Sequence, residues 1–495
     1  MNFAAQLAAA GWADADALAE LARLALAEGE EERALPWLRA AATRGADARL
    51  WQWTGLLQRA LDLHEEALES FARAARLAPA DAGIAHGRAH VALEAGVGAV
   101  ALFEAARRLG SPKSEVLVGQ AAARLAAGQG EAAAAELDAI LAQVPLWIEG
   151  HRQLGQIRSM LGRPGEAAAS LERALAALPG EAMLWRALFD LHLLREDFAA
   201  LEESIARAEG QAEALRLEYA AIAAAERGET ARADGLFAAV PDGLALWRIR
   251  HLLRSGRLAE ALRRIDHELA SDRAAAAWPY AAAAWRLAGD PRSAWLDGDP
   301  RLVRTIELGA EALGNGALAP LLRALHVARG EYLDQSVRGG TQTDGPLFSR
   351  IAPEIRTLRG AVTHAVRDYL AQLPPIDPAH PLLRHRRDRV PRFAGSWSVR
   401  LRGGGHHANH VHPQGWISSA LYVALPSRVP GEPADAGWLT LGEPQAALGL
   451  NLPLAQRIEP RAGRLVLFPS WMWHGTLPFA QGERLTVAFD VAPPR

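Results

Sequence analysis

The sequence predicts an α+β protein of several domains, with an all-α solenoid first and a domain of short antiparallel strands last. Residues 1–295 are rich in Ala, Leu, Arg and Glu, and their apolar residues recur with the helical period. Residues 391–495 instead contain β-branched and aromatic runs that Gly and Pro separate, a pattern typical of strands. The pattern of residues 296–390 is mixed, and we expect connecting and supporting helices and loops there.

The helical part repeats itself with a period close to that of a known helical hairpin. One window contains Trp51, Gly55, Ala67, Phe71, Ala74 and Pro79. A second set is repeated after 34 residues, and its two copies are Ala133, Leu137, Ile140, Pro145 and Ala167, Leu171, Ala174, Pro179. Small Ala lets two antiparallel helices approach, the large residue fills the space between them, and Pro ends the second helix. This spacing resembles the tetratricopeptide repeat, and the resemblance implies a concave surface that binds a protein or peptide partner.

The central segment contains three features that the sequence distinguishes. We expect Gln335 to Gly345, which is rich in Gly and Thr, to form a loop. This loop is either a simple turn or a lid that contacts the substrate through Arg338 and Gln342. Pro353 begins an amphipathic helix. The Pro-rich stretch Leu373 to Leu383 is typical of a linker.

The last fifth of the chain contains five runs that we expect to form strands. They are Ser396 to Leu401, Trp416 to Leu425, Gly437 to Gly442, Gly463 to Pro469 and Arg484 to Val491. Because no helical pattern separates these runs, they favour an antiparallel sandwich or jelly roll, also called a double-stranded β-helix.

Composition excludes several classes of function. The 495 residues include no cysteine, which excludes disulfides, thiolate zinc sites, iron–sulfur clusters and cysteine nucleophiles. Lys and Arg number 54 and Asp and Glu 57, so a formal charge of −3 gives no reason to expect a nucleic acid or an anionic membrane. The N-terminus lacks the basic region of a signal peptide, and no apolar run is long enough to span a bilayer. We therefore expect a cytoplasmic protein.

Three histidines of the strand-rich region are candidate metal ligands. His410 and His412 are two residues apart, so on an extended segment their imidazoles point to the same side. His474 follows the predicted strand Gly463 to Pro469, and in a jelly roll a distant strand of this kind lies beside the first two ligands. Arg484, at the start of the last predicted strand, is expected on a neighbouring strand that faces the same interior.

Several blocks of this region resemble the Fe(II)- and 2-oxoglutarate-dependent oxygenases, and most of all a bacterial branch in which tetratricopeptide repeats precede the oxygenase. The blocks are SWSVRL, NHVHPQGWISSALYV, GRLVLFPSWMWHGT, ERLTVAFD and the earlier QSVRGGTQT. The resemblance implies that His410, His412 and His474 bind Fe(II). It implies that Arg484 binds the remote carboxylate of 2-oxoglutarate and that O₂ is the oxidant. The implied activity is hydroxylation of a protein or peptide that the repeats recruit.

One departure from the superfamily leaves the ligand set open. His412 stands where most members have Asp or Glu, so three neutral imidazoles would surround the metal. Glu443 and Asp490 are alternative carboxylate ligands. Two other functions also stay open at this point, a non-catalytic interaction protein with a degenerate jelly roll and a three-His dioxygenase that does not use 2-oxoglutarate.

The sequence leaves the surroundings of this site less defined. His406 and His407 are expected to be loop residues, with one of them able to orient a ligand imidazole. Trp416, Trp471, Trp473 and Phe468 form an apolar, Trp-rich wall beside the candidate ligands. Trp471 and Trp473 alternate along the chain, so we expect one in the core and one lining the pocket.

Overall fold

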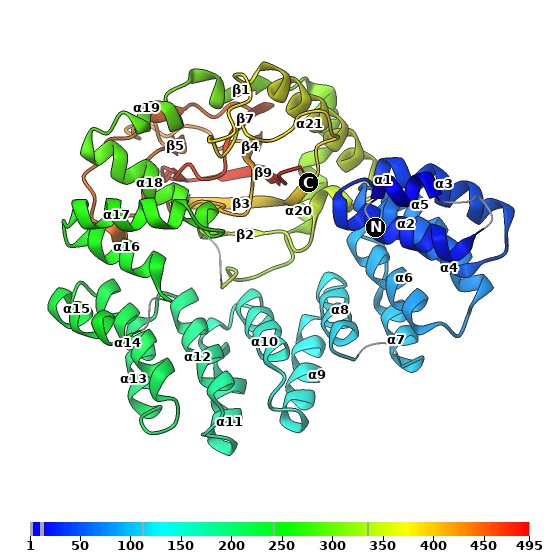
Figure 1. Cartoon of the computed structure of the whole chain (residues 1–495), viewed down its shortest axis with the longest axis horizontal. Helices are drawn as coiled ribbons and strands as arrows, with labels where there is room; N and C mark the ends of the chain where they lie inside the picture. The colour runs from blue at the N-terminus through cyan, green and yellow to red at the C-terminus, as the bar shows by residue number, and fades with distance from the viewer. Residues whose placement is uncertain (1–2, 10–13, 111–112, 241–242, 334–335, 495) are drawn as a thin grey trace.

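The computed structural model describes residues 3–9, 14–110, 113–240, 243–333 and 336–494. Figure 1 shows an arc of helices that begins at the N-terminus and curves around a C-terminal domain of strands. The predicted fold class is confirmed, because a helical N-terminal region precedes a domain of antiparallel sheets.

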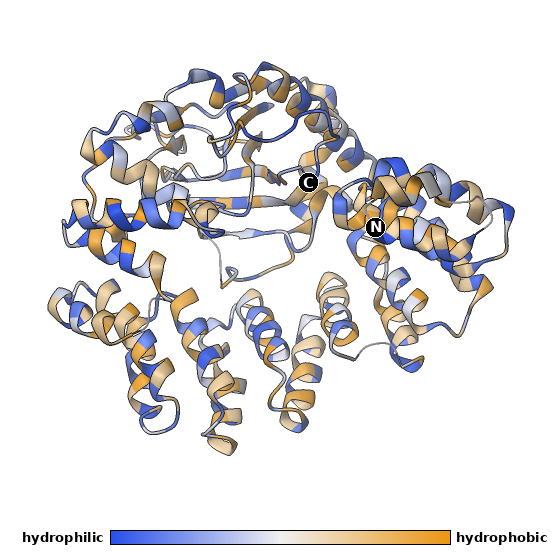
Figure 2. Cartoon of the chain, in the orientation of Figure 1, coloured by the Kyte–Doolittle hydropathy of each residue, from blue (hydrophilic) through white to orange (hydrophobic). Residues whose placement is uncertain are grey.

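The helices of the arc follow one another as antiparallel hairpins. They are α1 Phe3–Ala9, α2 Ala15–Glu28, α3 Glu31–Arg44, α4 Ala48–Ala60, α5 His64–Leu77, α6 Ala82–Glu94, α7 Val100–Arg108, α8 Lys113–Ala126, α9 Gly130–Gln143, α10 Ile148–Met160, α11 Ala169–Ala177, α12 Ala182–Leu194, α13 Phe198–Arg207, α14 Glu213–Glu226, α15 Thr230–Ala239, α16 Ala245–Arg254, α17 Leu258–Leu269, α18 Ala274–Ala288 and α19 Arg292–Asp297. Figure 2 shows hydrophilic and hydrophobic residues alternating along these helices, as expected where one face of each helix is buried.

The repeat signature has a direct physical basis in the structure. Phe71 of α5 is fully buried, and a Cβ on Gly55 of α4 or on Gly87 of α6 would come within 2.7 Å and 2.3 Å of its ring. Glycine at both positions therefore lets Phe71 insert between two neighbouring helices. Asp47 and Asp81, which are 34 residues apart, cap α4 and α6 by accepting hydrogen bonds from backbone amides of the first turn.

The C-terminal domain consists of two antiparallel sheets with supporting helices. The strands are β1 Arg304–Glu307, β2 Val337–Gln342, β3 Phe393–His407, β4 Ile417–Ala424, β5 Leu439–Leu441, β6 Gln456–Ile458, β7 Arg464–Pro469, β8 His474–Thr476 and β9 Glu483–Val491, and the helices are α20 Leu318–Leu325 and α21 Pro353–Gln372. The larger sheet has the order β1-β7-β4-β9-β3-β2 and the smaller β6-β5-β8. Tyr422 and Phe468 of the larger sheet pack with Leu439 and Leu441 of the smaller, so the sheets share a core.

Two predictions for the central segment are corrected by the structure. Arg338 and Gln342 lie in β2, an edge strand paired with β3, and not in a turn or loop. Gln335 lies outside the described residues. Leu373 to Leu383 is not a linker, because Leu382 and His380 are buried and the His380 imidazole bonds the Leu296 carbonyl at 3.0 Å. Pro374 and Pro381 of this segment are also buried, whereas Pro375 and Pro378 are exposed.

The hydrophobic core continues across the position where we expect the helical region to end. Ile249 and Trp285 of the last repeats belong to the same buried cluster as Leu302, Val362 and Leu467 of the strand domain. The division at 295 and 296 is therefore a change of sequence pattern within one continuous core.

The inner face of the arc holds the strand domain at several points. Arg329 and Gly330 both donate backbone hydrogen bonds to the Met160 carbonyl of α10, and Ile351 donates one to the Ala95 carbonyl after α6. At the far end of the arc, Arg250 of α16 donates to the side chain of Gln445 at 2.9 Å. Hydrogen bonds at the ends of α6 and α10 and on α16 thus join the arc to the strand domain. None of the described helices combines the length and hydropathy needed to cross a bilayer.

Candidate metal centre

The three histidines meet where the segment after β3 pairs with β8. His410 and His474 form an isolated antiparallel bridge, with reciprocal backbone hydrogen bonds of 2.9 and 3.0 Å. The His412 amide donates to the Ser470 carbonyl at 3.0 Å. The expected extended geometry is present, and it places both members of the His-x-His pair beside the distant histidine.

The side chains of this trio can hold a metal ion. One ring nitrogen from each of His410, His412 and His474 lies within 4.8 Å of the others. Among the described residues, this is the one group of at least three His, Asp or Glu side chains that meets this distance. The structure thus brings together the three residues that the sequence pattern indicated, and neither Glu443 nor Asp490 belongs to the group.

Hydrogen bonds at Nδ1 of the three rings favour the tautomers whose Nε2 lone pairs can bind a metal ion. The Nδ1 atoms of His410 and His474 lie 2.8 and 2.9 Å from the carbonyls of Ala408 and Met472. Because a carbonyl can only accept, each Nδ1 carries the proton and each Nε2 keeps its lone pair. The Nδ1 of His412 is 2.5 Å from Asp490 Oδ2, which fixes the same tautomer.

Asp490 orients a histidine of the trio and does not join it. Its second oxygen, Oδ1, accepts a hydrogen bond of 2.6 Å from the buried Ser418 hydroxyl, which is cross-strand to Asp490. The carboxylate is therefore fixed on one side by β4 and on the other by the His412 ring. A carboxylate in this position raises the basicity of a ligand imidazole.

Burial keeps the imidazoles of His410 and His474 neutral, as metal ligation requires. Burial, and next the neighbouring His412, lower the pKa of His410 to about 3. Burial and the neighbouring His410 likewise hold the pKa of His474 well below its usual value. At neutral pH both rings therefore present lone pairs.

Arg484 lies inside the domain beside two groups that the sequence analysis did not single out. Its side chain is buried on β9, and its Nη1 donates to Thr476 Oγ1 of β8 at 2.9 Å. The guanidinium carbon lies 5.0 Å from the centre of the Tyr422 ring. Both Arg484 Nε and the Tyr422 hydroxyl are buried without a hydrogen-bond partner in the described part of the chain. A buried guanidinium that faces a hydroxyl and no acidic side chain in the described part of the chain suits a bound carboxylate.

His407, expected in a loop, is the last residue of β3 and lies beside the trio. Its ring is stacked at 5.8 Å from that of His410, and its Nδ1 lies 3.0 Å from the Ser336 hydroxyl. The same hydroxyl lies 3.2 Å from His410 Nε2. Ser336 was missed by sequence analysis, since its neighbours give no metal-site pattern.

The Trp-rich wall is mostly structural. The Trp471 and Trp473 indoles donate to Asp297 and to the Pro279 carbonyl, and the Trp416 indole donates to the Leu382 carbonyl. The expectation that Trp471 or Trp473 lines the pocket gains no support, since these contacts anchor both rings away from the trio. Two other rings contact it, Phe468 at 4.8 Å from His474 and Trp397 at 5.6 Å from His412.

Comparison with known proteins relates the strand domain to a family. Residues 395–490 match the family model described as "Putative 2OG-Fe(II) oxygenase". The strand domain matches the 2-oxoglutarate- and Fe(II)-dependent oxygenases. The match includes the histidine trio and Arg484, so the resemblance stated for this part of the sequence is confirmed. No curated protein sequence matches the chain.

Solved structures are similar to parts of the chain only at a low level. YrrB, a TPR protein with an unusual peptide-binding site, is 19% identical over 35% of this chain and 91% of its own, with a TM-score of 0.28. A tetratricopeptide repeat protein from Parabacteroides merdae is 19% identical over 47% and 95%, with a TM-score of 0.29. A Pseudomonas putida prolyl-4-hydroxylase is 19% identical over 39% and 92%, with a TM-score of 0.27. Similarity at this level indicates neither a shared substrate nor a shared activity.

Proposed function

We propose that the protein is an Fe(II)- and 2-oxoglutarate-dependent dioxygenase of the cytoplasm that hydroxylates a protein or peptide. The observation that carries the proposal is the position of the buried Arg484 and Tyr422 next to a histidine trio, inside a segment that matches the oxygenase family. This pair favours an oxygenase that uses 2-oxoglutarate over a three-His dioxygenase that does not.

The spacing along β8 supports a single co-substrate that joins both sites. His474 and Thr476, the partner of Arg484, are two residues apart on this strand and point to the same side. Two residues of a strand span about 7 Å, a distance that a five-carbon dicarboxylate can bridge. One end would then lie at the trio, and the other at Arg484.

In this proposal the chain's own residues have three tasks. His410, His412 and His474 would hold Fe(II) through Nε2, and Asp490 keeps His412 in the required orientation. Arg484, with Tyr422, would bind the remote carboxylate as a charged and hydrogen-bonding pair. Bound Fe(II), 2-oxoglutarate and O₂ would supply the oxidation of a C–H bond.

Recruitment of a protein segment is supported by a cavity between the arc and the strand domain. It has a volume of about 630 Å³, and its lining includes Val97, Val118, Ala122, Val327 and Gln342. Val327 is half exposed, and the buried Gln342 Oε1 has no hydrogen-bond partner in the described chain. The polar side chains of Glu94, Asp344 and Arg350 also line this cavity. A largely apolar cavity suits an extended peptide, whose backbone N–H can donate to Gln342. This supports the earlier interpretation of Gln342 as a substrate contact.

The test is an anaerobic titration of the metal-free protein with Fe(II) and then 2-oxoglutarate, followed by visible absorption. Chelation of Fe(II) by the 2-oxo acid produces a charge-transfer band without any substrate. We expect the band in the unaltered protein, a loss of 2-oxoglutarate affinity in Arg484→Ala, and a smaller loss in Tyr422→Phe. Thermal unfolding of each variant checks that it is folded.

Each alternative function predicts a different outcome. Binding of Fe(II) without a band would favour a three-His dioxygenase that does not use 2-oxoglutarate. No binding of Fe(II) would favour an interaction protein with a degenerate strand domain.

A further inference from the structure

The N-terminal end of the arc meets the strand domain through charged side chains. Glu30, Glu31 and Glu32 stand at the start of α3, and Arg389 and Arg392 lie in the segment that precedes β3. Arg389 forms an ion pair with Glu30. Arg392 Nη2 lies 3.1 Å from Glu31 Oε2 and 2.8 Å from Glu32 Oε1. We call these five side chains the clasp, because they join α3 to the strand domain.

Among the described residues, the helices α1–α7 share no buried hydrophobic cluster with the strand domain. The clusters that pack these helices together contain residues only up to Ala123 of α8. The other end of the arc is different, because Ile249 and Trp285 belong to the core of the strand domain. Figure 1 shows α1–α7, which we call the arm, in blue at one end of the arc.

The remaining contacts of the arm with the strand domain are also polar. Arg356 of α21 lies 2.6 Å from Glu65 of α5, and both side chains are more than half exposed. Arg359 of the same helix donates to the Asp62 carbonyl. With the bond from the Ile351 amide to the arc, these contacts hold the arm without a shared core.

Two cavities interrupt the packing along the boundary of the arm. One has a volume of about 290 Å³, and its lining includes Ala60 on the arm and Leu370 and Trp416 on the strand domain. The other is the cavity at Gln342, which Val97 of the arm also lines. A polar boundary with incomplete packing resembles a transient interface, across which relative motion is the default expectation.

Opening of this boundary costs less than exposing a core would. Glu30, Glu31 and Glu32 lie at the N-terminus of α3, where the helix dipole favours negative charge even without the arginines. Glu30 also accepts a hydrogen bond of 3.2 Å from Arg33 of the same helix. Because each repeat of a solenoid contacts mainly its neighbours, the arm can move as a unit without unfolding.

Movement of the arm would widen the cavity at Gln342. Val97 and Val100 line this cavity from the arm, whereas Val327 and Gln342 line it from the strand domain. Separation of the two sides therefore opens a path to the apolar lining.

We propose that the clasp is a latch that holds the arm against the strand domain, and that its release admits the substrate segment to the cavity at Gln342. The latch follows from the contacts of the arm alone. Only the identity of the occupant rests on the proposed function.

The test measures how fast a bulky maleimide labels a cysteine placed in the cavity. The chain has no cysteine, so Val118→Cys supplies a single reactive thiol. Val118 is half-buried on α8 and lines the cavity. Val144→Cys is the control thiol, because Val144 is 51% exposed at the end of α9 and does not line the cavity. The measurement uses the full-length protein without metal, 2-oxoglutarate or substrate.

Two sets of variants release the clasp from opposite sides. Arg389→Gln/Arg392→Gln removes its cations, and Glu30→Gln/Glu31→Gln/Glu32→Gln removes its acids. Even exposed ion pairs stabilise by factors of about 1.4 to 5 each. Loss of all the pairs of the clasp should therefore accelerate labelling of the cavity thiol by about 3- to 100-fold. Labelling of the control thiol should be unchanged, and thermal unfolding checks that each variant is folded.

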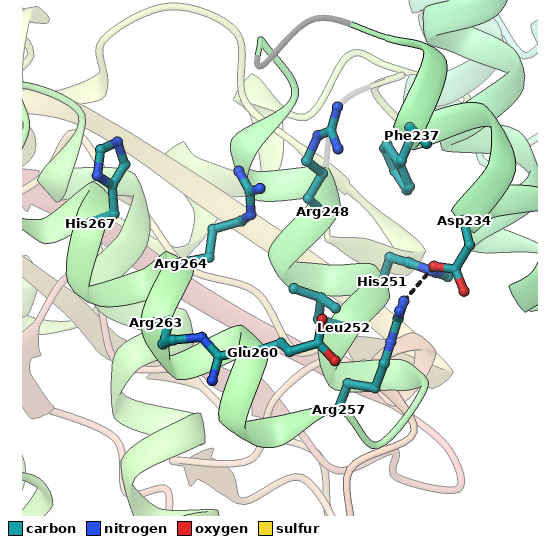
Figure 3. A pocket seen from close by; sticks show the side chains of 11 residues that line it. Asp234, Phe237, Arg248, His251, Leu252, Arg257, Glu260, Arg263, Arg264 and His267 are labelled. Carbon is teal, nitrogen blue, oxygen red and sulfur yellow. Dashed lines mark hydrogen bonds and ion pairs between the residues drawn. The ribbon is translucent and has the colours of Figure 1, made fainter.

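Arg257→Gln is the matched variant that breaks an ion pair elsewhere. Figure 3 shows Arg257 at the pocket between α15, α16 and α17, where it donates to Asp234 at 2.5 Å. Both partners belong to the arc, so this ion pair does not join the arc to the strand domain. Its loss should leave labelling of the cavity thiol unchanged.

Three outcomes would overturn the latch. They are unchanged labelling of the cavity thiol in both sets of clasp variants, an equal acceleration at the control thiol, and an equal acceleration in Arg257→Gln. Accelerated labelling of the cavity thiol alone would support the latch, and it would do so even if the protein formed no charge-transfer band with Fe(II) and 2-oxoglutarate. That combination would refute the proposed function and keep the latch.

Discussion

Asp490→Asn tests whether the carboxylate behind His412 compensates for the absence of a carboxylate ligand. The substitution keeps an oxygen that can accept from His412 Nδ1, but it removes the negative charge. The hydrogen bond of 2.5 Å and the width of the imidazole ring put that charge about 5 Å from His412 Nε2. We therefore expect weaker metal binding with little change in the fold.

The magnitude follows from Coulomb's law. Two unit charges 5 Å apart interact by about 1 kcal/mol in water and by about 3 kcal/mol at an effective dielectric constant of 20. Asp490 is only 9% exposed, so the energy at a dielectric constant of 20 applies better than the energy in water. These energies correspond to losses of roughly fivefold to a few hundredfold in affinity. Loss of a group that supports a metal ligand typically costs about 10–100-fold, and we expect the result in that range.

The assay is an anaerobic competition between the protein and a chelator for Fe(II). Asp297→Asn is the matched control, because it neutralises a partly buried carboxylate, one that accepts a hydrogen bond of 2.9 Å from Trp471 away from the trio. The control should bind Fe(II) as the unaltered protein does. Affinity of Asp490→Asn within about twofold of the unaltered protein would refute the compensation. Complete loss, equal to that in His412→Ala, would show that Asp490 is itself a ligand.

Three further predictions address the site, the strand domain and the arc. His474→Ala should abolish iron-dependent decarboxylation of 2-oxoglutarate, and full activity would refute the assigned ligand set. Burial raises the pKa of Asp297 to about 6. Between about pH 4 and pH 6 the native state therefore binds a proton that the unfolded chain has lost. The free energy of unfolding should consequently fall by about 3 kcal/mol as the pH rises from about 4 to about 6. Asp297→Asn should remove this slope in denaturant titrations, and an unchanged slope would place its origin elsewhere. Phe71→Ala should lower the free energy of unfolding by about 3–5 kcal/mol, and a loss below about 1 kcal/mol would contradict the insertion of Phe71 between Gly55 and Gly87.

Local patterns predicted the repeats and the close approach of His410 and His412 because both depend on short spacings. His410 and His412 need only an extended segment to point together, and Phe71 needs only the helical period to face the next repeat. All five predicted strands are present, as β3, β4, β5, β7 and β9. A spacing of this kind is a property of a few adjacent residues, so it can be read without knowing the tertiary structure.

The residues that sequence analysis missed are those whose role depends on pairing between distant strands. Tyr422 meets Arg484 only because β4 and β9 pair with Tyr422 opposite Thr486. Asp490 meets Ser418 through the same pairing. β2 was missed because Gly339 and Gly340 have low strand propensity, which the pairing with β3 overrides.

Self-contact on the inner face of the arc changes how the repeats can act. A free solenoid offers its whole concave surface to a partner, but here Met160 and Ala95 are already bonded to the strand domain. A substrate segment must therefore bind in the space between the arc and the strand domain, where the cavity at Gln342 lies. A partner that does not reach this space must bind elsewhere on the arc.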